Sequence, residues 1–221
     1  MGILEIDQTN RQITVLSNIF LYGNAISQSI KIEMQDEINQ LWNEPRGIVW
    51  LDQYPYLINF DIKVFLFPDL KIHDILLNKN PRNNYFRIEE FAHGNISFVD
   101  GLGCNTGYFK LENLYKGSTT AAHEYGHTLG LPHPEELDIR GQGQPGIMYP
   151  RGTIVDAIYQ YEPTALPGEK GGTLYPIHRR VLQHDIDNLR VDHYIQNRNY
   201  CLGKFSSVYH EQHDEGISGI V

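Results

Sequence analysis

Apolar residues first gather in runs that favour β-strands. Segment 12–22 (QITVLSNIFLY) is rich in β-branched and aromatic residues, and Gly23 follows it. This pattern is typical of a strand that ends in a turn. Shorter runs with a similar composition follow along the chain. The other predicted strands are 47–52, 57–67, 96–99 and 107–111.

Three segments carry apolar residues at helical spacing: 26–42, 118–131 and 177–193. The first is an amphipathic pattern, and the second begins with Ser and Thr and ends at a glycine, as helices often do. Segment 132–176 is rich in Pro and Gly, which cannot sustain strand ladders, and 69–87 is rich in Asn, Lys and Pro. We therefore expect both of these segments to be irregular. The apolar face of the first helix consists of Ile26, Ile30, Met34, Ile38 and Leu41.

The order of these elements predicts an α+β domain with an α/β-like upper half. We expect a twisted sheet of four or five strands with two long helices against it, Ile26–Trp42 and Ser118–Leu131. A mostly irregular C-terminal half with one helix should follow. The chain is short enough to be a single domain, 1–221. A cleft should divide it into an N-terminal subdomain, 1–134, and a C-terminal subdomain, 135–221.

Composition and charge exclude several classes of protein. The chain has 221 residues, of which 41% are hydrophobic and 20% charged, and this excludes a disordered chain. A net charge of −9 argues against a nucleic-acid partner. No apolar run approaches the roughly 20 residues that a membrane span needs. The first residues, MGILEIDQTNRQITV, lack the basic start and apolar stretch of a signal peptide.

The chain has two cysteines, Cys104 and Cys201. Two are too few for a disulfide scaffold, and a chain of this length can build its core without one. They could form a single bridge or remain two thiols, and their sequence separation leaves both alternatives open.

The segment that indicates chemistry is Ala121–Pro134 (AAHEYGHTLGLPHP). His123 and His127 are four residues apart, so a helix places both imidazoles on one face, where they can share a metal ion. Gly130 can end the helix in a left-handed conformation and let His133 return as a third nitrogen ligand. Three neutral imidazoles with one open position are typical of a catalytic zinc site. Glu124, next to the first ligand, is the candidate general base.

This segment resembles the active-site signature of the metzincin clan of zinc endopeptidases, and the lead-in Ala121-Ala122 is similar to that of matrixins. Pro134, after the third histidine, resembles the serralysin group. Downstream, Gly146–Pro150 (GIMYP) is similar to the clan's Met-turn. The resemblance implies a zincin fold in which Met148 forms an apolar floor beneath the metal. Pro150 stands where some clan members have a tyrosine, so a tyrosine fifth ligand is not expected.

The resemblance also implies how substrate binds. A peptide should add as a strand to a sheet edge that comes from Gly103–Leu111 and runs along the cleft, and the loop 149–152 should wall the pocket beyond the cleaved bond. The loop at Asp100 loosely resembles a matrixin calcium site, but Asn95 replaces an expected carboxylate, and calcium is the weaker expectation. The residues expected to contact substrate are Asn105, Thr106, Gly107, Tyr108, Phe109, Tyr149 and Pro150.

The sequence therefore favours a zinc-dependent endopeptidase with one catalytic Zn²⁺ and a protein or peptide substrate. Two alternatives stay open: a zinc-bearing module that binds peptides without cleaving them, and a zinc hydrolase of a non-protein amide. Glu124 argues against the first, because a site without catalysis has no use for a general base. By resemblance we expect a monomer and a secreted protein, although no signal peptide is visible.

Overall fold

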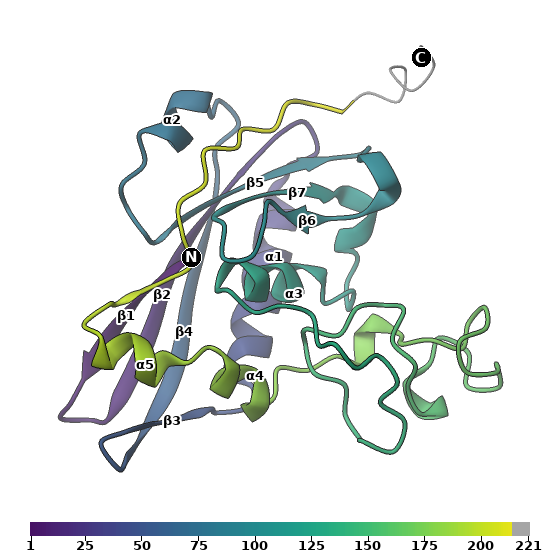
Figure 1. The fold of residues 1–221 in the computed structure, drawn as a ribbon. Helices are drawn as coiled ribbons and strands as arrows, with labels where there is room; N and C mark the ends of the chain where they lie inside the picture. Colours follow the sequence, from purple (N-terminus) through teal and green to yellow (C-terminus); the bar gives the residue numbers. More distant parts are fainter. Residues whose placement is uncertain (214–221) are drawn as a thin grey trace.

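A twisted sheet of eight strands is the main element of the described residues, 1–213, of the computed structural model (Figure 1). Six strands lie in the order β3-β4-β2-β5-β7-β6. The four in the middle are parallel, and β3 and β6 run antiparallel to their neighbours. The strand bounds are β1 Gly2–Asp7, β2 Gln12–Tyr22, β3 Ile48–Leu51, β4 Tyr54–Leu66, β5 Asn83–Glu89, β6 Phe98–Val99, β7 Thr106–Lys110 and β8 Cys201–Leu202.

β2 is long enough to hold two strands on one side. β1 pairs antiparallel with residues 12–16 of β2, and β5 pairs in parallel with residues 18–22, while β4 occupies the other side. β8 adds to β1. Every second residue of β2 is buried, which is the alternation that a strand between two layers requires. The sheet has more than the predicted four or five strands, because β1, β5 and β8 were not predicted.

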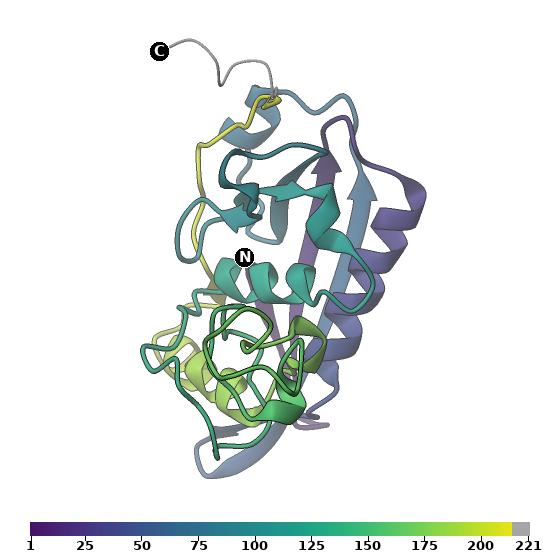
Figure 2. The same cartoon turned by 90° about the vertical axis from the view of Figure 1, so that its right-hand side faces the viewer.

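Helices α1 (Gln28–Asn43) and α3 (Thr120–Thr128) pack together beside β4 and β2. The indole N–H of Trp42 on α1 donates to the carbonyl of Ala122 at 3.1 Å, and its ring meets that of Tyr125 edge-on. Figure 2 shows α3 between the strand-rich upper part of the molecule and the irregular segment below it. The remaining α-helices are short: α2 Ile72–Leu76, α4 Gln183–Asn188 and α5 Val191–Gln196.

The prediction that 69–87 is irregular is wrong in its second half. β5 is a central strand between β2 and β7, and six of its seven residues are buried. Three of those six are polar. The Asn84 side chain bonds to backbone carbonyls, and Arg87 pairs with Glu89. A buried strand can contain polar residues when they are hydrogen-bonded or ion-paired, because their burial then costs little. The pattern of apolar residues therefore did not reveal β5.

The predicted helix 177–193 is also wrong. α4 and α5 are separate, because Arg190 between them has a left-handed backbone with φ 52°. The helix predicted over 118–131 is shorter, since Thr119 has φ 54° and α3 begins only at Thr120. Isolated left-handed residues of this kind end helical hydrogen bonding. Neither residue is a glycine, so nothing in the sequence marks these breaks.

The sheet edge near the cleft differs from the prediction. We expected it within Gly103–Leu111, but β7 is covered by β6, with Phe98 opposite Tyr108 and Val99 opposite Gly107. β6 therefore forms the edge of the sheet. We predicted a strand at 96–99, which contains β6, but strand order is not visible in the sequence, so the edge was assigned to β7 instead.

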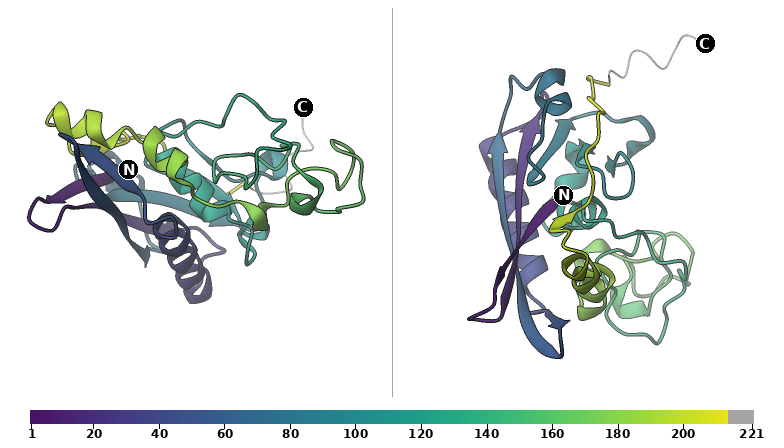
Figure 3. Two further views of the ribbon diagram at one scale, coloured as in Figure 1. Left: turned by 90° about the horizontal axis from the view of Figure 1, so that it is seen from below. Right: turned by 60° about the vertical axis from the view of Figure 1, so that its left-hand side comes forward.

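The composition of 132–176 predicted its structure correctly, since this segment contributes no strand to the sheet. It contains the 3₁₀ turn Ala157–Tyr159 and isolated bridges such as Gln160 with Leu174. Figure 3 shows these loops on the opposite side of the molecule from the long strands β2 and β4. Both cysteines are free thiols, Cys104 buried and Cys201 half-buried. Within residues 1–213, no helix combines the length and apolarity that a bilayer crossing requires.

Candidate metal centre

α3 and the turn after it position three histidines. His123 and His127 lie one helical turn apart on α3. The helix ends in a left-handed Gly130, with φ +102°, whose N–H donates to the His127 carbonyl, and the N–H of Leu131 donates to the Gly126 carbonyl. This is the hydrogen-bond pattern that closes a helix at a glycine. The reversed chain then carries His133 back toward the helix.

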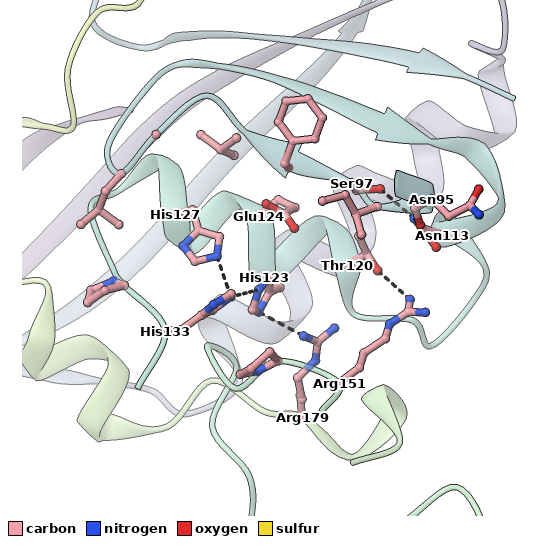
Figure 4. Close-up of a pocket in the computed structure, with 17 residues that line it drawn as sticks. Asn95, Ser97, Asn113, Thr120, His123, Glu124, His127, His133, Arg151 and Arg179 are labelled. Carbon is pink, nitrogen blue, oxygen red and sulfur yellow. Dashed lines mark hydrogen bonds between the residues drawn. The ribbon is translucent and has the colours of Figure 1, made fainter. Parts of the chain in front are cut away.

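The three imidazoles converge on one point (Figure 4). Nε2 of His133 lies 3.0 Å from Nε2 of His123 and 3.1 Å from Nε2 of His127. The Nδ1 of His123 donates to the carbonyl of Ile147 at 2.7 Å, and the Nδ1 of His127 donates to the carbonyl of Leu131 at 2.7 Å. Because a proton on Nδ1 leaves Nε2 with its lone pair, these bonds prepare both Nε2 atoms as ligands.

The surroundings keep the histidines neutral. Burial lowers the pKa of His123 well below its ordinary value, with the nearby Arg179 adding to the effect. Burial also lowers the pKa of His127 to about 4 and lowers that of His133. A neutral imidazole is the form that binds a transition metal.

This donor set fits zinc. Three nitrogens at about 2.0–2.1 Å from a tetrahedral zinc would lie roughly 3.3–3.4 Å apart, close to the two separations above. Two facing Nε2 atoms can share only one proton in a hydrogen bond. Three Nε2 atoms around one point therefore leave lone pairs that face and repel each other. A cation bound to His123, His127 and His133 would satisfy all three.

Glu124 lies beside these histidines in a cavity of about 690 Å³. Its exposure is only 6%, and burial raises the pKa of its carboxyl to about 8, against an opposing effect of Arg179. A carboxyl with such a pKa can exchange a proton near neutral pH.

Met148 packs tightly under α3. A Cβ placed on Gly126 would overlap the Met148 sulfur and lie 3.2 Å from the Trp42 ring, so a larger residue would require Met148 to move. The preceding residue, Ile147, supplies the carbonyl that orients His123. The segment predicted as the Met-turn therefore contacts the histidine helix through both its backbone and its methionine.

A distant carboxylate caps the start of α3. Glu37 on α1 accepts a hydrogen bond from the N–H of Ala122 at 3.2 Å. The side chain of Thr119 donates elsewhere and caps no N–H, and the Ser118 hydroxyl accepts only from the first helical N–H, that of Thr120. Burial raises the pKa of Glu37, and backbone N–H groups of α3 partly offset this. A carboxylate here satisfies free N–H groups and the positive end of the helix dipole.

Arg179 is central to the site, although no pattern in the sequence indicated it. Its exposure is 2%, and it precedes α4 in an irregular stretch. Its Nε donates to the Thr119 hydroxyl at 2.8 Å, Nη2 to the Ser118 carbonyl at 2.9 Å and Nη1 to the Tyr149 carbonyl at 3.1 Å. Nη1 also lies 3.0 Å from the Nδ1 of His123. No periodic pattern or motif could have placed this arginine beside the histidines.

The structure places only some of the residues expected to contact substrate beside the histidine cavity. Pro150 lines the histidine cavity, but Tyr149 lines a neighbouring one. Residues 105–109 are buried and do not line the cavity, and β6 pairs with two of them, Gly107 and Tyr108. Its upper wall is instead the segment 95–99.

The loop that loosely resembled a calcium site is held by protein groups. The Asp100 carboxylate accepts from the Thr106 hydroxyl at 2.5 Å and pairs with Nε2 of His210 at 2.8 Å. The hydrogen bond between His210 and Asp100 holds the C-terminal segment against the loop before β7.

Comparison with known proteins adds little to this description. No protein-family model matches the chain, and no curated protein is similar to it. Among solved structures, the crystal structure of archaemetzincin from Methanopyrus kandleri is similar over 80% of this chain and 95% of its own, with 11% identity and a TM-score of 0.39. The function of the site must therefore be inferred from its own residues.

Proposed function

We propose that this protein is a zinc-dependent endopeptidase of the metzincin type. The observation that carries the proposal is the convergence of three neutral imidazole Nε2 atoms beside a buried carboxyl in an open cavity. Structural zinc sites are closed by four protein ligands, whereas this group offers three and leaves one position for water or substrate.

His123, His127 and His133 hold the metal in this proposal. A zinc ion there would supply a Lewis acid that lowers the pKa of water and polarises a peptide carbonyl. Glu124 accepts the proton of the attacking water and donates it to the departing amine nitrogen. Its raised pKa supports this role, because the same group must take up and release a proton.

Other residues around the site hold the three histidines and Glu124 in position. Gly130 allows the turn that returns His133, and Met148 supports the helix from below. Glu37 caps the helix start. Errors of about 1 Å in such positions cost catalysis heavily, which supports a role for these residues in holding the ligands and Glu124 in place.

A peptide substrate would bind extended along β6. This strand is at the end of the sheet, without a second strand partner among residues 1–213. Residues 96–99 line the cavity that holds Glu124. Main-chain hydrogen bonds to such an edge bind peptides with little dependence on their sequence. This assignment replaces the one to residues 105–109.

The test is cleavage of an unfolded protein by the zinc-loaded enzyme, with and without a chelator. Glu124→Ala should keep its zinc and lose activity by roughly 10²–10⁴-fold. Zinc binding without chelator-sensitive cleavage would favour a peptide-binding module. Hydrolysis of small amides without cleavage of proteins would favour the non-protein hydrolase. Near wild-type turnover of zinc-loaded Glu124→Ala would refute the general-base role.

A further inference from the structure

The charge of the cavity differs from that of the whole chain. The protein carries a net charge of −9. Among residues 1–213, however, the histidine cavity is lined by two arginines, Arg151 and Arg179, and by a single acidic residue, Glu124. With neutral histidines the cavity is therefore positive, and a bound zinc ion would make it more so. Clefts of one sign concentrate ligands of the opposite sign.

Neither arginine is neutralised by a contact. Within residues 1–213, no carboxylate lies within ion-pair distance of Arg151 or Arg179. Among residues 1–213, Arg179 is buried and donates to uncharged oxygens, and its Nη1 also lies 3.0 Å from the Nδ1 of His123. Glu124 and Glu37 attract the Arg179 guanidinium only from beyond ion-pair distance. Because burying a cation without a direct ion pair is costly, stability alone is a weak explanation for this arrangement.

Arg151 is the accessible member of the pair. It is half-buried, and among residues 1–213 its guanidinium contacts only the Thr120 hydroxyl, at a long 3.5 Å, and the face of Tyr115, at 5.8 Å. Most of its five N–H donors are therefore available to a ligand. Figure 4 shows Arg151 reaching into the cavity toward Thr120, on the side of Arg179 away from His133.

The position of Arg151 relates it to the reaction. Thr120 precedes Glu124 by four residues on α3, so the two side chains share a helix face with Cβ atoms roughly 6 Å apart. A ligand on Arg151 would therefore sit about one helical turn from the general base. A substrate side chain next to the cleaved bond, or the terminal carboxylate of a short peptide, would lie at about this distance from Glu124.

We propose that Arg151 binds a carboxylate of the substrate, with the positive charge of Arg179 behind it. The inference rests on the proposed peptidase function and names the substrate class, which is a peptide with a negative charge beside the cleaved bond. The carboxylate comes from an Asp or Glu side chain or from the C-terminus of the peptide. A guanidinium matches either through paired hydrogen bonds.

Cleavage of matched peptides tests the proposal. A zinc-loaded enzyme receives peptides with Glu or Gln on either side of the cleaved bond, each with a free or an amidated C-terminus. We expect kcat/KM to be about 10-fold or more higher for the charged member of a pair, which is the contribution of a hydrogen bond to a charged group. Arg151→Gln should remove the preference, and Arg151→Glu should reverse it in favour of Lys.

The control is Arg140→Gln. Arg140 is exposed, pairs with Asp138 and does not line the cavity. This variant should keep the preference for a charged peptide. If kcat/KM differs between the Glu and Gln peptides, the bound carboxylate is that of the side chain. If kcat/KM changes only when the C-terminus is amidated, the bound carboxylate is that of the C-terminus. Equal cleavage of all the peptides would overturn the proposal.

A binding measurement separates this inference from the proposed function. Zinc-loaded Glu124→Ala should bind the charged peptide about 10-fold more tightly than its neutral partner, and a second change, Arg151→Gln, should abolish the difference. If no peptide is cleaved but this difference remains, the peptidase function fails and the carboxylate site stands. If peptides are cleaved but bind equally, the carboxylate site fails alone.

Discussion

Replacing Glu124 by Gln should make the metal-free protein more stable while it removes the general base. Glu124 is nearly buried, and burial raises the pKa of its carboxyl from the ordinary 4.5 to about 8. The folded protein thus retains a proton that the unfolded chain has already lost at neutral pH. Gln has a similar shape and cannot ionise, so it avoids the cost of a buried charge.

The magnitude follows from the two pKa values. Between the unfolded-state and folded-state pKa values of Glu124, this group lowers the free energy of unfolding by about 1.4 kcal/mol for each pH unit. From pH 4.5 to pH 7 this amounts to roughly 3 kcal/mol, and at pH 5 it is below about 1 kcal/mol. The sign is that of a raised folded-state pKa: the stability is present below pH 4.5 and is lost as the pH rises toward 8. The advantage of Gln should therefore grow with pH.

Urea unfolding of the metal-free proteins at pH 5, 6, 7 and 8 measures this difference. Glu135→Gln is the matched control, because Glu135 is exposed and its change should stay within about 0.5 kcal/mol at every pH. Adding zinc should shrink the advantage of Gln, since a nearby cation favours the ionised carboxylate. A difference between wild type and Glu124→Gln that is independent of pH would refute the reasoning.

Three further predictions concern the helix that carries the motif. His133→Ala should reduce bound zinc well below one per chain in metal analysis, and full occupancy would exclude His133 as a ligand. Glu37→Ala should lower the free energy of unfolding by about 1 kcal/mol, the usual contribution of a helix cap, whereas an unchanged denaturation midpoint would show that the Ala122 N–H needs no cap. Gly126→Ala should cost about 1–3 kcal/mol in the same measurement, because its Cβ would overlap the Met148 sulfur; wild-type stability would mean that Met148 repacks freely.

Local patterns determined much of this protein. The alternation in segment 12–22 predicted β2 with the bounds that the structure has. The amphipathic pattern predicted α1 to within two residues at its start. The spacing of His123, His127, Gly130 and His133 predicted their convergence, because a helical turn and a glycine stop fix those positions over a few residues.

Only the tertiary structure decided the features that depend on distant partners. β5 is buried although it contains Asn84, Arg87 and Glu89, because their partners come from other segments. The edge of the sheet is β6 and not β7, because strand order is set by pairing between separate segments. Arg179 reaches His123 across 56 residues of chain. Period and spacing describe only neighbours along the chain, whereas polar pairing, strand order and the charge of the cavity arise when distant segments meet.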